Sequence, residues 1–202
     1  MTIKNIIFDL GGVILKQKST LMEEIISQMF SLPMDKATII WKKYKHRLLI
    51  LEDNSKQFLK ELKKILKDPT GLDQLWNSWK ILYIKKAKVD NRVLKFISQL
   101  KKNYRVYLMS DTIDAHDEVN SRRGIYDFFD KVFVSHKEKL RKSNTQAFVN
   151  VLKKTKSQPD ETILIDDLKE NVKKAEELGI KGITYRNLRQ LENDLVKLGV
   201  KF

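Results

Sequence analysis

The sequence contains no cysteine among its 202 residues. This absence excludes disulfide bonds, thiolate metal sites and cysteine nucleophiles, and it suits a reducing compartment. No apolar run approaches the roughly 20 residues that a membrane-spanning helix requires. The stretch from Met1 to Leu15 lacks a basic segment ahead of its apolar residues, so we interpret it as the start of the fold and not as a signal peptide. We therefore expect a cytoplasmic protein with no membrane partner.

Positive charge is what the sequence has in excess, with a formal net charge of +14. Clustered lysines and arginines would indicate nucleic-acid binding, because they neutralise phosphates. Here the lysines are spread through nearly every expected helix and alternate with apolar residues, which is typical of solvated helix faces. A general attraction for anionic substrates stays open. We do not expect nucleic acid as a partner.

Apolar periodicity predicts one strand followed by a long helical part. Residues 3–8 form a short run rich in β-branched side chains that ends at Asp9 and a glycine pair, which is typical of a buried parallel strand. Residues 16–86 show only helical spacing, and we expect no strand there. Thr20 and Glu23 predict a capping box at the first helix. Four helices are expected, over residues 20–33, 35–51, 55–66 and 72–84, and Pro33 separates the first from the second.

From residue 87 onward, helices and strands alternate. The expected strands cover residues 105–109, 131–134, 162–165 and 181–185, with helices between them and after the last. This alternation predicts the α/β class, with a Rossmann-like parallel sheet and helices on both of its faces. We expect residues 1–15 and 87–202 to form this core, and residues 16–86 to form an inserted all-helical cap.

Polar side chains follow the predicted strands at their carboxyl ends, and these are Asp9, Ser110, Asp111, Asp166 and Asp167. Ligands of parallel sheets bind at this edge, so we expect these side chains to converge. Lys142 lies at the start of the helix expected after the third strand, within reach of the same edge. Carboxylates, a hydroxyl and a lysine together suit a phosphate and a hard divalent cation such as Mg²⁺.

Four segments of the sequence, IIFDLGGVIL, VYLMSDT, LRKSNTQAF and ILIDDLKEN, resemble in that order the four motifs of the haloacid-dehalogenase superfamily. The resemblance spans essentially the whole chain. It implies that Asp9 attacks the substrate, most often at phosphorus, and forms an aspartyl intermediate. It implies substrate binding by Ser110, Asp111 and Lys142. It further implies a Mg²⁺ site made by Asp9, the backbone carbonyl of Gly11, Asp166 and Asp167, and a helical cap that closes over the site and selects the substrate.

The sequence departs from the family that it resembles at Gly11. Most phosphatases of that family carry there a second aspartate, which serves as the general acid for the leaving group. Glycine supplies no proton, and general acid–base catalysis is typically worth about 10²–10⁴ in rate. The family includes a branch with this DLG-type loop, some of whose members are sugar-phosphate phosphatases. Asp114, His116 and Lys16 are candidate substitutes whose positions the sequence leaves open.

These observations favour a Mg²⁺-dependent phosphatase that removes phosphate from a small phosphorylated metabolite through an aspartyl-phosphate on Asp9. Two alternatives stay open. The first is a low-activity binding or regulatory module, which Gly11 favours. The second is a 2-haloacid-type dehalogenase that acts at carbon; this chemistry needs no Mg²⁺ and would leave the Asp166–Asp167 pair without a purpose. The identity of the substrate and the oligomeric state do not follow from the sequence.

Overall fold

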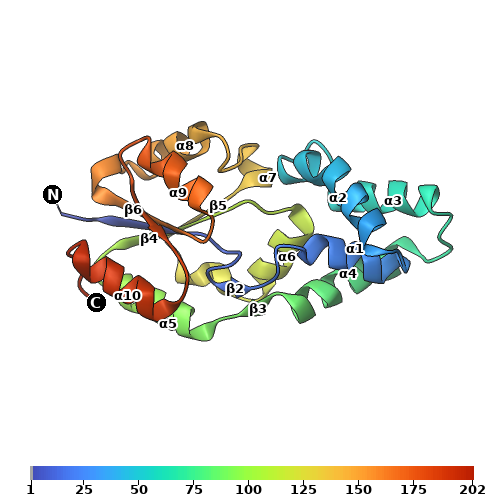
Figure 1. Ribbon diagram of the computed structural model, residues 1–202, viewed down its shortest axis with the longest axis horizontal. Helices are drawn as coiled ribbons and strands as arrows, with labels where there is room; N and C mark the ends of the chain where they lie inside the picture. Colours follow the sequence, from blue (N-terminus) through green and yellow to red (C-terminus); the bar gives the residue numbers. More distant parts are fainter. Residues whose placement is uncertain (1) are drawn as a thin grey trace.

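A computed structural model describes residues 2–202 of the chain. Its centre is a five-stranded parallel sheet in the order β5-β4-β1-β6-β7 (Figure 1). The strands are β1 (Asn5–Phe8), β4 (Arg105–Ser110), β5 (Lys131–Val134), β6 (Thr162–Asp166) and β7 (Lys181–Thr184). The predicted α/β class and parallel sheet are confirmed.

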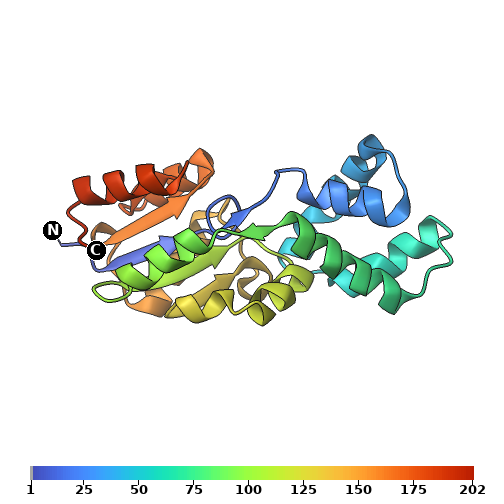
Figure 2. The same cartoon turned by 90° about the horizontal axis from the view of Figure 1, so that it is seen from below.

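Helices cover both faces of this sheet. Ile6 and Phe8 of β1 belong to an apolar cluster with α5 (Asn91–Leu100) and α10 (Leu188–Lys197). Ile7, which points to the opposite face, belongs to a cluster with α8 (Thr145–Thr155) and α9 (Lys169–Glu176). Figures 1 and 2 show these two layers on either side of the strands. Burial on both faces explains why β1 is apolar at consecutive positions and does not alternate.

Shorter elements complete the core. Helix α6 (Asp114–Arg122) follows β4, and the 3₁₀ helices η1 (Ile125–Phe128) and η2 (Pro159–Glu161) precede β5 and β6. Helix α7 (Ser135–Glu138) follows β5 directly and was not predicted, because four residues are too few to show helical periodicity. None of the helices within residues 2–202 is both long and apolar enough to cross a membrane.

Four helices lie between the first strand and the rest of the sheet in sequence, and they pack together at the end of the molecule away from both termini (Figures 1 and 2). We call them the helical segment: α1 (Leu21–Phe30), α2 (Met34–Leu49), α3 (Ser55–Ile65) and α4 (Leu72–Lys86). Its interior is aromatic, because the ring of Phe58 contacts Tyr44 at 5.0 Å and Trp79 at 5.7 Å, edge to face in both cases.

The chain enters and leaves the helical segment through a two-stranded antiparallel ribbon, β2 (Leu15–Lys16) and β3 (Lys88–Val89). The expectation that residues 16–86 contain no strand is therefore wrong at Lys16. Strands of two residues are too short to produce a recognisable alternation. Asp90, which caps α5, holds the ribbon through an ion pair of 2.9 Å to Lys16 Nζ.

The predicted capping box at α1 is also wrong. Thr20 is the N-cap, but its backbone has φ −92° and ψ 17° instead of the extended conformation of a capping residue, and its hydroxyl contacts Glu24 at 3.2 Å. A complete capping box occurs instead at α3. The side chain of Asn54 accepts from the Gln57 backbone N–H, and the Gln57 side chain accepts from the Asn54 N–H.

Candidate active site

Three acidic or hydroxyl side chains lie at the carboxyl ends of adjacent strands. Asp9 directly follows β1, Ser110 ends β4 and Asp166 ends β6. The register places them side by side, since Phe8 pairs with Leu108 on one side and with Ile165 on the other. All three are buried, with 6% or less of each residue exposed. The sequence prediction that these residues share one edge of the sheet agrees with their arrangement.

Lys142 connects two of these carboxylates. Its Nζ lies 2.6 Å from Asp9 Oδ1 and 2.6 Å from Asp166 Oδ2, and 2% of its side chain is exposed. The lysine is in the loop before α8, which begins at Thr145, and not at the start of that helix as expected. The loop is fixed by Asp111, whose Oδ1 accepts from the Lys142 backbone N–H at 3.0 Å. Arg141 Nε contacts Asp111 Oδ2 at 3.3 Å.

Asp166 and Asp167 have different surroundings. Asp166 Oδ1 accepts from the backbone N–H of Leu168 at 2.9 Å and from Asn171 Nδ2 at 3.0 Å, and its other oxygen receives Lys142. Asp167 has no ion-pair partner among residues 2–202. One oxygen from each of Asp9, Asp166 and Asp167 lies within 4.8 Å of the others. An oxygen-only donor set of this size fits a hard cation such as Mg²⁺.

A tight turn after β1 brings the backbone close to Asp167. Gly12 has φ +76°, and a Cβ atom built there would lie 2.1 Å from Asp167 Oδ2. Only glycine therefore allows the turn and the aspartate to approach this closely. The sequence signalled the turn through its glycine pair, but it did not signal the contact with Asp167, which lies more than 150 residues later in the chain.

Burial and the neighbouring charges both shift the pKa values in this cluster. Burial raises the pKa of Asp9 to about 7; Asp166 adds to this rise and Lys142 opposes it. Burial and the neighbouring Asp166 also raise the pKa of Asp167. Burial alone would lower the pKa of Lys142, but the charges of Asp9, Asp166 and Asp111 outweigh it and the net shift is upward. Two buried carboxylates, Asp9 and Asp166, thus share one buried ammonium group.

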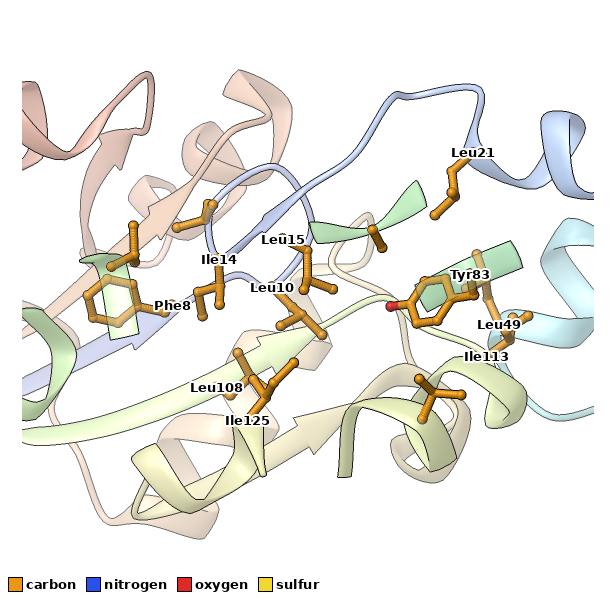
Figure 3. Close-up of a cluster of buried hydrophobic side chains, with 14 of the residues drawn as sticks. Phe8, Leu10, Ile14, Leu15, Leu21, Leu49, Tyr83, Leu108, Ile113 and Ile125 are labelled. Carbon is orange, nitrogen blue, oxygen red and sulfur yellow. The ribbon is translucent and has the colours of Figure 1, made fainter. Parts of the chain in front are cut away.

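A cavity of about 370 Å³ opens above these residues. It is lined by Asp9, Ser110 and Lys142 from the core and by Trp41 and Tyr83 from the helical segment. The volume lies within the range of about 300–1,000 Å³ that is usual for small-molecule sites. Figure 3 shows Leu10, in the loop after β1, and Leu15 of β2 on the side of the core that faces Tyr83 and Leu49 of the helical segment, and all four residues line the cavity.

The three candidate substitutes for a general acid have distinct positions. Asp114 accepts a hydrogen bond from the Ser55 backbone N–H at 3.0 Å and contacts the Ser55 hydroxyl, so it links α6 to α3. Lys16 pairs with Asp90 in the ribbon. Only His116 lines the cavity, and its burial lowers its pKa to about 3, so it carries no charge near pH 7.

Two features of the site were not anticipated from the sequence. Asn171 holds both oxygens of Asp166, at 3.0 and 3.1 Å, from the first turn of α9. The hydroxyl of Ser135 accepts from the backbone N–H of Thr112 at 3.0 Å and donates to its carbonyl at 3.1 Å, which fixes the loop after Ser110. Ser135 directly follows β5, and its contact with a loop 23 residues away depends on the pairing of β4 with β5.

The site thus combines a tight turn after β1, a buried lysine between Asp9 and Asp166, and a helical segment whose residues line the same cavity. The chain belongs to the haloacid dehalogenase-like hydrolases, because the model of that family matches residues 3–179. The predicted family is thus confirmed.

Relatives of known structure and known name share this architecture. The chain is 28% identical to a D-ribitol-5-phosphate phosphatase from Bacteroides thetaiotaomicron over 189 residues, which cover 88% of this chain and 89% of the relative. A crystal structure of a HAD family enzyme from the same organism has a TM-score of 0.81 at 24% identity, with 92% of this chain and 95% of that chain covered. Another crystal structure of that enzyme, in complex with magnesium and inorganic phosphate, has a TM-score of 0.78 at 24% identity and covers 91% and 94%.

Proposed function

We propose that the protein is a Mg²⁺-dependent phosphatase that acts on a small phosphorylated metabolite. The observation that carries this proposal is the position of Lys142, which lies 2.6 Å from both Asp9 and Asp166 and lines the cavity beside them. A buried ammonium next to a buried carboxylate can hold a phosphoryl group against that carboxylate. The 28% identity to a D-ribitol-5-phosphate phosphatase over most of both chains supports the same chemistry.

In the proposed reaction, a carboxylate oxygen of Asp9 attacks phosphorus and the bond from phosphorus to the ester oxygen breaks. This step leaves an aspartyl-phosphate on Asp9 and releases the alcohol. A water molecule then attacks phosphorus, which returns Asp9 as a carboxylate and releases inorganic phosphate. Ser110 and Lys142 are proposed to bind the phosphoryl oxygens and to balance the charge on them during both steps.

The metal-binding residues in this proposal are Asp9, Asp166, Asp167 and the carbonyl of Gly11, which also lines the cavity. Bound Mg²⁺ would neutralise negative charge on the phosphoryl group and orient it. Asp166 also holds Lys142 and Asn171, so its proposed role is to position the lysine as much as to bind the cation. Asp111 uses both carboxylate oxygens to hold the loop of Lys142, and we propose that it supports substrate binding through that loop.

The proton for the leaving alcohol has no carboxyl donor at Gly11. Asp114 and Lys16 are engaged in contacts elsewhere, and His116 is held neutral by burial. We therefore propose that water in the cavity supplies this proton. Esters with poor leaving groups should then react slowly, by up to the roughly 10²–10⁴ that a positioned general acid contributes.

The helical segment is proposed to act as the cap, with residues 1–15 and 87–202 as the core and residues 16–86 as the cap domain. Trp41 and Tyr83 of this segment line the same cavity as Asp9. Lys45 lines it as well and is exposed, which suits an anionic ligand. Substrate selection would therefore depend on residues that the sheet does not contribute.

The test is hydrolysis of p-nitrophenyl phosphate with Mg²⁺, with EDTA, and by the Asp9→Asn variant. The activated ester needs little leaving-group protonation, so it tests the nucleophile and the metal separately from the missing acid. We expect turnover with Mg²⁺. The rate should fall at least 10³-fold with EDTA, which removes the metal ion, and with Asp9→Asn, which removes the proposed nucleophile. Asp73→Asn, at an exposed position of α4, is the matched control and should retain full activity.

Turnover that is the same in Asp9→Asn as in the unchanged protein would contradict the proposal. A second candidate, a low-activity binding module, is favoured by one observation, the glycine at position 11. It predicts that phosphate esters bind with Mg²⁺ while even the activated ester is not hydrolysed above the Asp9→Asn rate.

A further inference from the structure

His116 is held rigidly between the core and the helical segment. Its ring stacks on that of Tyr83, with centroids 3.7 Å apart and planes 8° apart. Its Nε2 accepts a hydrogen bond from Trp79 Nε1 at 3.1 Å. Tyr83 is fixed in turn, because its hydroxyl donates to Asn120 Oδ1 at 3.2 Å and accepts from Asn120 Nδ2 at 2.9 Å. The imidazole therefore has one orientation.

The contact with Trp79 also determines which nitrogen carries the proton. An indole N–H can only donate, so Nε2 of His116 must be the acceptor and the proton of the neutral ring is on Nδ1. Burial lowers the pKa of His116 to about 3, which keeps the ring neutral at physiological pH. His116 thus presents one hydrogen-bond donor without a charge.

This donor has no partner among residues 2–202. Nδ1 of His116 makes no hydrogen bond to any of these residues. It is also not among the side-chain atoms that are both without a partner and completely shielded from solvent. It therefore remains accessible although only 7% of the residue is exposed. The ring lines the same cavity as Asp9 and Ser110, which is the space in which a substrate would lie.

We infer that His116 is a substrate-binding residue whose Nδ1–H donates a hydrogen bond to a hydroxyl oxygen on the alcohol half of a phosphate ester. The inference rests on the proposed phosphatase function and extends it to the class of substrate. The phosphoryl group, which is charged, is matched by the ammonium of Lys142. A neutral donor between aromatic side chains suits an uncharged oxygen on a carbon skeleton, as in a polyol or sugar phosphate.

The distinction matters for specificity. A site built to bond a hydroxyl rejects an analogue that lacks it, because the donor is then left buried without a partner. Apolar side chains alone discriminate only weakly between an ester with a hydroxyl group and one without it. Trp41 and Leu49 also line the cavity and would contact the carbon chain of either ester equally. His116 is therefore the residue that should separate a hydroxylated ester from its deoxy counterpart.

Binding can be measured without turnover on the Asp9→Asn background, by titration calorimetry with MgCl₂. The probes are ribitol 5-phosphate, glucose 6-phosphate and glycerol 3-phosphate, each compared with an alkyl phosphate of similar length such as n-pentyl phosphate. We expect at least one hydroxylated ester to bind at least tenfold more tightly than the alkyl phosphate. His116→Phe, which retains the stacking surface, should remove this preference and change the Kd of the alkyl phosphate by less than threefold.

Two further variants separate binding from packing. His116→Asn can accept from Trp79 and still donate, so it should recover part of the preference. Trp79→Phe leaves His116 in place but frees its Nε2, and it should weaken the preference less than His116→Phe does. Equal weakening of all esters by His116→Phe, or the absence of any preference for hydroxylated esters, would overturn the inference.

This experiment can fail independently of the phosphatase proposal. Because binding is read on Asp9→Asn, a lack of turnover by the unchanged protein would contradict the proposed reaction and would leave the preference that depends on His116 intact. Turnover of the aryl phosphate without a preference for hydroxylated esters would do the opposite.

Discussion

The ammonium of Lys142 lies 2.6 Å from Asp9 Oδ1, although only 2% of the lysine side chain and 9% of the aspartate side chain are exposed. This buried ion pair links the loop before α8 to the residue that follows β1. Burial of a charge is costly unless a partner compensates it, so each member of the pair depends on the other. The consequences can be measured as stability as well as activity.

Replacement of Lys142 with methionine should destabilise the fold. It leaves Asp9 and Asp166 buried and close together without a cation, and breaking a buried pair in this way typically costs about 3–5 kcal/mol. Urea unfolding in EDTA is the measurement, since added Mg²⁺ would partly replace the lost charge. Lys153→Met, at an exposed position of α8, should change the free energy of unfolding by less than about 0.5 kcal/mol. Equal effects of the two substitutions would show that the buried pair has no special role.

Gly12→Ala should displace Asp167. Gly12 has φ +76°, and the added Cβ would lie 2.1 Å from Asp167 Oδ2, so both the turn and the carboxylate must shift. We expect a loss of about 1–3 kcal/mol in the free energy of unfolding. We also expect a Kd for Mg²⁺ that is at least tenfold higher, as measured from thermal unfolding over a range of Mg²⁺ concentrations. Gly71→Ala is the control, because nothing lies within 4 Å of its added Cβ. A Gly12→Ala protein with unchanged Mg²⁺ dependence would separate this turn from the metal site.

Asp114 should act in structure and not as the general acid. Its carboxylate receives the Ser55 backbone N–H and hydroxyl across the boundary between α6 and α3. Asp114→Ala should therefore reduce stability by about 1–3 kcal/mol, which is typical for a part-buried hydrogen-bonded carboxylate. Asp114→Asn keeps an acceptor and should leave the hydrolysis rate within threefold. A loss of about 10² in rate for Asp114→Asn, with a changed pH profile, would instead assign it the acid role.

Acid should destabilise the fold through His116. Burial lowers the pKa of His116 from 6.5 to about 3, so the unfolded chain binds a proton at this ring at a pH where the folded chain does not. Stability from this group is therefore complete above pH 6.5 and falls as the pH decreases toward 3, by about 1.4 kcal/mol for each pH unit. His116→Phe has no such proton and should flatten the dependence of unfolding free energy on pH between 6.5 and 4. An unchanged slope in this variant would contradict the assignment.

The three central strands of the sheet, β1, β4 and β6, could be predicted because they are buried on both faces. The run from Ile6 to Phe8 has no polar position, and its end at Asp9 followed by glycines marks a strand that enters a tight loop. The alternation after residue 87 then places Ser110 and Asp166 at the same edge as Asp9. The apolar runs and their alternation with helices can be recognised in the sequence itself, so the gathering of Asp9, Ser110 and Asp166 at one edge of the sheet could be predicted without coordinates.

The contacts that complete the site were not accessible in this way. Asn171 on Asp166, Trp79 on His116 and Asp111 on the Lys142 loop each join residues that are brought together by packing. Local signals can also mislead. Thr20 and Glu23 match the spacing of a capping box, but the backbone that enters α1 from β2 holds Thr20 in a conformation that does not allow it. Tertiary geometry therefore overrides the local pattern at the start of α1.

The ribbon of β2 and β3 has a consequence for how this chain can change. Lys16 and Lys88 are paired neighbours, so the helical segment leaves the core and returns to it at a single point. None of the five core strands lies between these two residues, so a change in the length of the helical segment does not require a change in the order of those strands. The helical segment could therefore be replaced in evolution by another segment attached to the same two strands, while Asp9, Asp166 and Lys142 keep their positions in the core.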